Sequence, residues 1–138
     1  MYKPKHFSTY ELVDRQTYEL LGGNAIKLFN EGLLKDLDNL REHFDKQITV
    51  NDWNWGGVLT QRGFRTSLSE TGGKTSQHRK GNAIDFDVEG KTAQQVRDYI
   101  VENKDLYPSI NRMESNVGWV HIDCHPDYKD KRIYLFSP

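Results

Sequence analysis

The spacing of apolar residues in the first third of the chain predicts helices. Ser8 and Glu11 fit a capping box, in which each side chain satisfies a free backbone N–H at a helix start. A short helix is therefore expected from residue 9 to about residue 13. Asp14 can cap a second helix, which Gly22-Gly23 should end because glycine favours the left-handed turn after a helix.

A longer helix is expected from Asn24 to Phe44. Gly32 weakens it locally, because glycine has a low helix propensity. Its apolar residues recur at three- and four-residue spacing, so they form one face that should pack on a core. These residues are Leu33, Leu34, Leu37, Leu40 and Phe44.

The pattern changes to strict alternation over residues 82–88, which predicts a strand. Its apolar face carries Ile84, Phe86 and Val88, and its other face carries Ala83, Asp85 and Asp87. One face should therefore pack on the core while the other presents carboxylates. Other segments expected to be strands are Ile48–Val50, Val58–Thr66, Asn111–Glu114, Trp119–Cys124 and Arg132–Phe136.

The order of these elements predicts the fold class. A capping box of Thr92 and Gln95 opens a helix that should reach about residue 103. Residues 51–57 and the polar residues 67–74, which include two adjacent glycines, are expected to be loops, the second one mobile. We therefore expect one α+β domain over residues 1–138, with helices first and then a small, mainly antiparallel sheet with a packed helix.

Composition excludes several classes of protein. The chain is 36% hydrophobic and 28% charged, which is typical of a globular domain. Its net charge of -1 gives no global attraction for nucleic acid, so no nucleic-acid partner is expected. There is no run long enough to span a membrane, and no apolar stretch follows the basic N-terminus, so a secretory signal is not expected. The single cysteine, Cys124, cannot form an internal disulfide.

Two segments carry metal-binding residue types. Residues 75–88 read TSQHRKGNAIDFDV and contain His78 and Asp85, while residues 119–123 read WVHID and contain His121. If the two strands are neighbours, these three side chains can converge on one ion. Three nitrogen and oxygen ligands with one open position are typical of a catalytic zinc site, whereas structural sites are usually closed by four ligands. Other divalent ions could also occupy such a set.

The same segments resemble a known family. SQHRKGNAID fits the S-x-H-x-x-G-x-A-x-D signature of the zinc D-Ala-D-Ala carboxypeptidases. Related members include the vancomycin-resistance D-Ala-D-Ala dipeptidases and the L-alanyl-D-glutamate endopeptidases of phage lysins, and the Hedgehog signalling domain shares the fold. WVHID resembles the family's second signature, and RGFRT resembles its upstream G-[FY]-R-[ST] segment. The three segments cover most of residues 62–123.

The resemblance implies roles for individual residues. It implies one Zn²⁺ per chain on His78, Asp85 and His121. It also implies that Arg65 faces the site and binds a substrate carboxylate or the developing oxyanion, since a guanidinium fork suits either. Ser76 is expected to shape the loop or to form a hydrogen bond near the ion and substrate. Trp119 lies two residues before His121 on the same expected strand, so it should share the face of His121 and line the substrate site.

This chain departs from the family pattern at the general base. Many members of the family carry a glutamate three residues before the last zinc histidine. That position is Gly118 here, and the nearest upstream acid is Glu114. Some phage-type members and the Hedgehog domain also place the acid further upstream, so Glu114 is the predicted base. Asp123 and Asp87 are the alternatives. Asp123 is otherwise expected to support a metal ligand through a hydrogen bond, and Asp87 is expected either to do the same or to face solvent.

Other candidate residues have more ordinary interpretations. His125 shares the predicted face of His121, so a supporting or substrate-binding role stays open. Trp53 and Trp55 could form the base of a substrate cleft, but we favour packing on a small core. Cys124 should point away from His121 and act as a small buried residue.

The resemblance implies a zinc metallopeptidase that hydrolyses peptidoglycan stem peptides, as a D-Ala-D-Ala carboxypeptidase or an L-Ala-D-Glu endopeptidase. A compact chain without a signal peptide resembles a phage or prophage lysin, or a virion-associated wall hydrolase. Such a protein is made in the cytoplasm and acts on the wall after lysis or export, and we expect it to be a monomer. The alternatives are a non-catalytic zinc-containing binding or structural module, which Gly118 keeps open, and a hydrolase of another amide.

Overall fold

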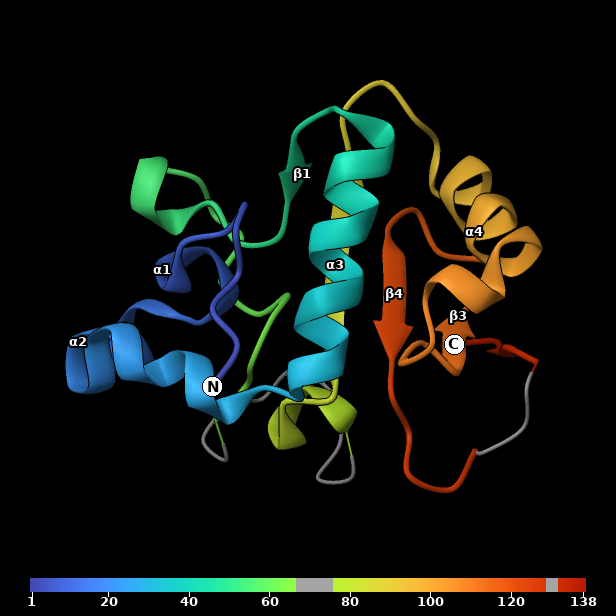
Figure 1. Ribbon diagram of the computed structural model, residues 1–138. Coiled ribbons are helices and arrows are strands. Elements are labelled where there is room, and N and C mark those ends of the chain that lie inside the picture. Colours follow the sequence, from blue (N-terminus) through green and yellow to red (C-terminus); the bar gives the residue numbers. More distant parts are fainter. Residues whose placement is uncertain (67–75, 129–131) are drawn as a thin grey trace.

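Helices fill the first third of the chain and a five-stranded sheet forms from the rest, as the computed structural model shows (Figure 1). The structure describes residues 1–66, 76–128 and 132–138. The predicted α+β class is confirmed. The loop expected over residues 67–74 lies outside the described residues. No helix in the described part of the chain is long and apolar enough to cross a membrane.

The two short helices begin and end where their capping residues predict. Helix α1 (Thr9–Leu12) starts where the Glu11 carboxylate accepts the backbone N–H of Ser8 at 2.7 Å. Helix α2 (Arg15–Leu21) follows Asp14 and ends at Gly22, whose φ of 57° lies in the left-handed region. Local sequence is sufficient here because both ends depend on contacts within a few residues.

The expected helix from Asn24 to Phe44 is wrong over its first seven residues. Residues Gly22–Leu28 form a 3₁₀ helix, and helix α3 (Glu31–Phe44) begins only after Asn30. The Asn30 side chain accepts the N–H of Leu33 at 3.0 Å, which caps α3. Its own backbone N–H donates to the carbonyl of Gly81 at 2.9 Å, so a tertiary contact sets the helix start.

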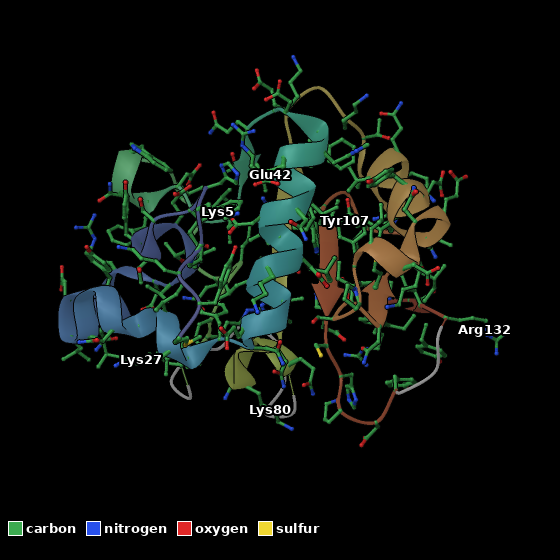
Figure 2. The ribbon with its side chains drawn as sticks, viewed as in Figure 1. Lys5, Lys27, Glu42, Lys80, Tyr107 and Arg132 are labelled. Carbon is green, nitrogen blue, oxygen red and sulfur yellow. The ribbon has the colours of Figure 1, made fainter. Side chains whose placement is uncertain are left out.

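The predicted apolar face of α3 is the centre of the core. Leu33, Leu34, Leu37 and Leu40 are fully buried, and Phe44 packs against them at the edge. Gly32 has a packing role as well, because a Cβ there would lie 2.0 Å from the hydroxyl of Ser109. Figure 2 shows Tyr107 inside the molecule, whereas the side chains of Lys27, Lys80 and Arg132 lie at the periphery.

The sheet is mixed but mainly antiparallel, as expected. Its order is β1-β2-β4-β3-β5, and every neighbouring pair is antiparallel except β3 with β5. The strands are β1 (Ile48–Thr49), β2 (Ala83–Val88), β3 (Arg112–Glu114), β4 (Val120–Asp123) and β5 (Tyr134–Phe136).

The strand expected over Val58–Thr66 is wrong, because this segment is irregular. Its backbone bonds to several separate parts of the chain instead of one neighbouring strand. The carbonyl of Arg62 accepts the N–H of Asp85 at 2.7 Å, and the N–H of Phe64 donates to the carbonyl of Leu12 at 2.9 Å. The N–H of Arg65 donates to the carbonyl of His78 at 3.2 Å. The segment therefore ties the N-terminal helices to the polar face of the sheet.

The two faces of the sheet have different environments. Ile84, Phe86 and Val88 of β2 join the core with α3, as the alternation predicts. Helix α4 (Ala93–Glu102) contacts β2 and β4, and its Thr92 hydroxyl accepts the N–H of Gln95 at 3.1 Å. The opposite face carries the acids and histidines, so the core positions the polar residues from behind.

Trp53 has the packing role that the sequence favoured. Its side chain is buried and its indole N–H donates to the carbonyl of Val13 at 2.8 Å. Trp55 is 57% exposed.

Gly63 occupies a position where a side chain does not fit, because a Cβ there would lie 1.8 Å from the carbonyl oxygen of Leu12. Gly63→Ala is expected to lower the free energy of unfolding by about 2 kcal/mol or more, since the backbone must shift. Gly118→Ala is the control, because a Cβ at Gly118 meets nothing within 4 Å. Urea unfolding measures both variants, and equal stabilities would contradict the packing at Gly63.

Candidate metal centre

Strand pairing places three polar residues in one row across the sheet. Asp85 of β2 lies opposite His121 of β4, and His121 lies opposite Glu114 of β3. Directly opposed residues share a face and have Cβ atoms about 4.5–5.5 Å apart. Strands β2 and β4, which carry the two motifs, are therefore neighbours. Convergence of the predicted metal ligands requires this arrangement.

His78 reaches the same face from a short 3₁₀ helix, Gln77–Lys80, that precedes β2. The hydroxyl of Ser76 caps this turn by accepting the N–H of His78 at 3.3 Å. Gly81 ends the turn with a φ of 72°, and a Cβ there would lie 1.7 Å from the carbonyl oxygen of Leu28. The sequence S-x-H-x-x-G thus encodes a tight turn that directs the histidine towards the sheet.

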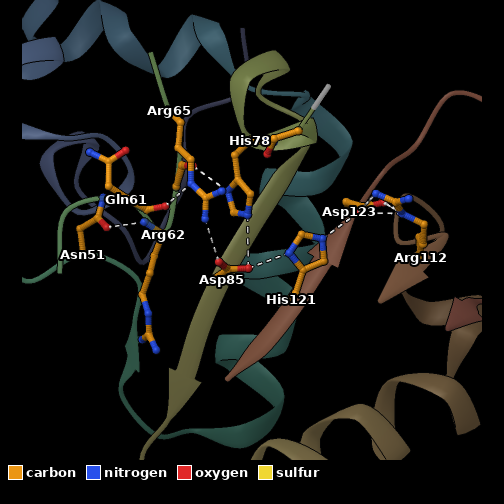
Figure 3. A network of polar contacts seen from close by, with 11 residues as sticks. Asn51, Gln61, Arg62, Arg65, His78, Asp85, Arg112, His121 and Asp123 are labelled. Carbon is orange, nitrogen blue, oxygen red and sulfur yellow. Dashed lines mark hydrogen bonds and ion pairs between the residues drawn. The ribbon is translucent and has the colours of Figure 1, made fainter. Parts of the chain in front are cut away.

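The three predicted ligands converge (Figure 3). Nε2 of His78 lies 3.3 Å from Oδ1 of Asp85, and Nδ1 of His121 lies 2.7 Å from the same oxygen. One ligand atom from each residue lies within 4.8 Å of the other two, and all three residues are buried. This cluster can hold a single metal ion.

Asp123 stands behind His121. Its Oδ2 lies 2.7 Å from Nε2 of His121, and its carboxylate also accepts hydrogen bonds from Nε and Nη2 of Arg112, the shortest at 2.9 Å. Asp123 is completely buried. An acid bonded to the outer nitrogen of a histidine fixes the ring and leaves the inner nitrogen for a metal.

A pocket of about 310 Å³ opens over the cluster. Arg65 stands at its β2 side, where Nη2 lies 3.4 Å from Oδ2 of Asp85 and Nε donates to the carbonyl of Gln61 at 2.7 Å. The described lining consists of Arg65, Ser76, Gln77, His78, Asp85, Arg112, Glu114, Trp119, His121 and Phe136. Most of these residues were expected at the site from the sequence.

Comparison with family models gives one match, to the family described as Peptidase M15, over residues 5–123. The match covers more than half of the chain and includes the whole cluster. The chain belongs to the peptidase M15 family. Members of this family depend on zinc. Neither curated proteins nor solved structures give a match.

The donor set of this M15 peptidase fits such a cation. Nδ1 of His78 lies 2.8 Å from the carbonyl oxygen of Gly63, so this nitrogen carries the proton and Nε2 keeps a lone pair. Nε2 is buried without a hydrogen-bond partner among the described residues, and it faces the Asp85 carboxylate. Two electron-rich atoms held face to face favour a cation between them, and imidazole nitrogen with carboxylate oxygen is a common ligand set for zinc.

Charges within the cluster are strongly coupled. Burial lowers the pKa of His121, but hydrogen bonds with Asp123 and Asp85 outweigh it and raise this pKa to about 9. Burial also raises the pKa of Asp85, but the hydrogen bond with His121 and the charge of that ring hold it well below its usual range. Without a metal, the cluster of the M15 peptidase therefore holds an imidazolium next to a carboxylate.

Two candidates from the sequence lie elsewhere. Asp87 is exposed and pairs with Arg62 at 2.7 Å, and it is absent from the described lining of the pocket. The ring of His125 accepts the N–H of Asp127 at 3.1 Å, and His125 is also absent from that lining. Asp87 therefore faces solvent, which is one of its two expected roles, and does not support the metal ligands.

Arg112 was not selected from the sequence, although it lies in the pocket and holds Asp123. A signal was available, because Arg112 precedes Glu114 by two residues on a predicted strand and so shares its face. Its partner could not be read from the sequence, since the pairing of Arg112 with Asp123 depends on the β3–β4 register.

Zinc binding to this M15 peptidase should depend on pH, because a proton on Nδ1 of His121 competes with the metal. The raised pKa of about 9 means that this proton is retained below that value. Apparent zinc affinity should therefore rise by about tenfold per pH unit between about pH 6 and 8, which is the effect of one released proton. Competition with a chromophoric chelator measures this affinity.

Asp123→Asn provides the internal test of that explanation. The variant removes one of the two carboxylates that raise the pKa of His121, so the affinity should level off at a lower pH. A zinc affinity that does not change with pH in the wild-type protein would contradict the expectation.

Proposed function

We propose that this M15 peptidase is a zinc-dependent hydrolase of peptide bonds in peptidoglycan stem peptides. One observation carries the proposal: His78, Asp85 and His121 converge below a pocket, with the acid Glu114 on the next strand of the same face. Membership of the M15 family supports a peptidase, and the motif resemblance supports peptidoglycan as the substrate.

In this proposal one zinc ion is held by Nε2 of His78, the carboxylate of Asp85 and Nδ1 of His121. When bound, zinc lowers the pKa of a water molecule to about 7 and polarises the scissile carbonyl. Asp123 and Arg112 keep the His121 ring in the orientation that points Nδ1 at Asp85.

Glu114 is the acid best placed to move the proton. It lies opposite His121 and lines the pocket, and its carboxylate has no hydrogen bond to another described residue. It can therefore accept a proton from the attacking water and pass it to the leaving amine. Asp123 is less suited to this role because its carboxylate is fully buried and bonded to His121 and Arg112.

Arg65 and Trp119 complete the substrate site in this proposal. Arg65 binds a substrate carboxylate or stabilises the oxyanion that develops on the scissile carbonyl. Trp119 walls the pocket and is 37% exposed, so part of its ring is accessible to substrate. Ser76 lies in the same lining and contacts substrate beside its role in holding His78.

The substrate class follows from these groups. A D-Ala-D-Ala terminus and an L-Ala-D-Glu bond both carry a free carboxylate next to the scissile amide, and Arg65 suits either. The lysin-type role suggested by the motif resemblance stays a prediction.

A second candidate is a zinc-containing module that binds without cleaving. It is favoured by Gly118, which stands where many members of the family carry a glutamate. Gly118 is exposed on the β3–β4 turn, and Arg97 holds this turn by donating to the carbonyls of Val117 and Trp119.

Glu114→Gln separates the two candidates. Loss of the proton acceptor should reduce the rate on purified peptidoglycan by about 10²- to 10⁴-fold while zinc stays bound. Mass spectrometry of the released fragments measures the rate, and metal analysis measures zinc. Asp87→Asn is the matched control, since this acid lies on the same sheet but outside the described pocket lining.

Unchanged turnover in Glu114→Gln would reject Glu114 as the base. Absence of fragments from the zinc-loaded wild-type protein would favour the binding module.

A further inference from the structure

An aromatic surface extends from the catalytic pocket to the free edge of the sheet. It consists of Tyr128, Tyr134 and Phe136, and we refer to it as the aromatic shelf. Phe136 of β5 lies opposite Glu114, and Tyr134 lies opposite Arg112. The shelf therefore shares the face of the metal cluster and lies on the β5 side, whereas Arg65 lies on the β2 side.

The shelf is continuous with the pocket. Phe136 lines the pocket, and its ring meets the His121 ring edge-on with centroids 5.6 Å apart. The guanidinium of Arg112 lies over the Phe136 ring, 4.3 Å from its centroid. A substrate in the pocket that extends towards β5 must pass over these rings.

Tyr134 is held in place but is open to solvent. Its ring stacks on Tyr128 with centroids 4.7 Å apart and is 49% exposed. A hollow of about 410 Å³ lies here, and its described lining consists of Tyr128, Arg132, Ile133, Tyr134 and Leu135. This volume is within the range of about 300–1,000 Å³ that is typical of small-molecule sites. Contiguous exposed apolar surface often marks a binding site.

We propose that the aromatic shelf binds the N-acetylated amino sugar to which the stem peptide is attached, and that the bond cleaved is L-Ala–D-Glu. The inference rests on the proposed function. The apolar C–H face of a pyranose ring can pack on the Tyr134 ring while the sugar hydroxyls and the phenol stay hydrated.

Distance along the substrate selects the bond. Strand β5 lies two strands from β4, which is about 10 Å at about 4.8 Å per strand. Tyr134 is two residues along β5 from Phe136, so it lies roughly 12 Å from the backbone of His121. A ligand group at the shelf must therefore be about this far from the scissile carbonyl.

An extended stem peptide brings the sugar to this distance when the first peptide bond is cleaved. One extended residue spans at most about 3.5 Å. The alanyl and lactyl groups separate the L-Ala carbonyl from the sugar, so the ring begins at roughly 7 Å and continues over the shelf. From a D-Ala-D-Ala bond five such units intervene, so a chain extended in the same way, roughly 17 Å long, would carry the sugar past the edge of the sheet.

Charge fixes the direction of the substrate. The departing D-Glu carries a free carboxylate next to the scissile amide, which suits Arg65 on the β2 side. The acyl side, which bears the sugar, then crosses the cluster towards β5.

The experiment compares two synthetic substrates that contain the same peptide. One carries the disaccharide, and the other keeps the lactyl amide without the sugar, so the charge near the scissile bond is unchanged. Wild-type kcat/KM for L-Ala–D-Glu cleavage should be about five- to tenfold higher with the disaccharide, the size expected for one aromatic contact.

Tyr134→Ala should collapse that ratio to about one, whereas Tyr134→Phe should keep most of it because the ring remains. Trp55→Ala is the matched control, since Trp55 is 57% exposed and absent from both linings as described. Thermal unfolding checks that each variant is folded. If Tyr134→Ala does not fold, Tyr134→Leu tests the same ring.

The outcomes separate the two proposals. Three results would overturn the shelf proposal while the peptidase function stands. They are equal kcat/KM on both substrates, an unchanged ratio in Tyr134→Ala, and release of terminal D-Ala in place of L-Ala–D-Glu cleavage. Failure of the zinc-loaded wild-type protein to cleave either substrate or a D-Ala-D-Ala pentapeptide would reject the proposed function and the shelf together.

Discussion

The register of β2 against β4 is the constraint on which the site depends. Asp85 opposes His121 because Ile84 pairs with Ile122, and both isoleucines are fully buried in the core. A slip of one residue would turn one strand over relative to the other and move its polar side chains to the opposite face. Burial of the apolar side chains on one face of β2 and β4 therefore determines which polar side chains lie opposite each other on the other face. In this way the hydrophobic effect fixes the position of the cluster. Glu114 gains its place in the same row through the β3–β4 register.

Polar contacts then orient what the register has placed. Arg112 bonds to Asp123, Asp123 to His121, and His121 to Asp85, so each group is held by the next. On the other side the carbonyl of Gly63 fixes the His78 ring. Buried charges of this kind persist when they are paired, and removal of one partner leaves the other unsatisfied. Burial of these charges opposes folding. The same hydrogen bonds orient the two imidazole rings so that one nitrogen lone pair of each points to the same place.

Local features of the sequence predicted much of this structure. The alternation over residues 82–88 and the Thr92 cap depend on neighbours in the chain, and both are present. The failures lie where tertiary contacts decide. Asn30 starts α3 partly through its bond to Gly81, and residues 58–66 lose strand geometry because their backbone bonds to several separate parts of the chain. Convergence of the metal ligands was foreseen through motif resemblance, whereas the role of Arg112 required the strand register.

The central claim is that His78, Asp85 and His121 surround one metal ion. X-ray absorption at the zinc edge of the zinc-loaded protein tests it most directly. We expect one zinc per chain with nitrogen and oxygen ligands at about 2.0–2.1 Å, a scattering pattern of two imidazoles, and the loss of one imidazole in His78→Ala. A sulfur ligand at about 2.3 Å, or a protein that retains no stoichiometric zinc, would contradict it.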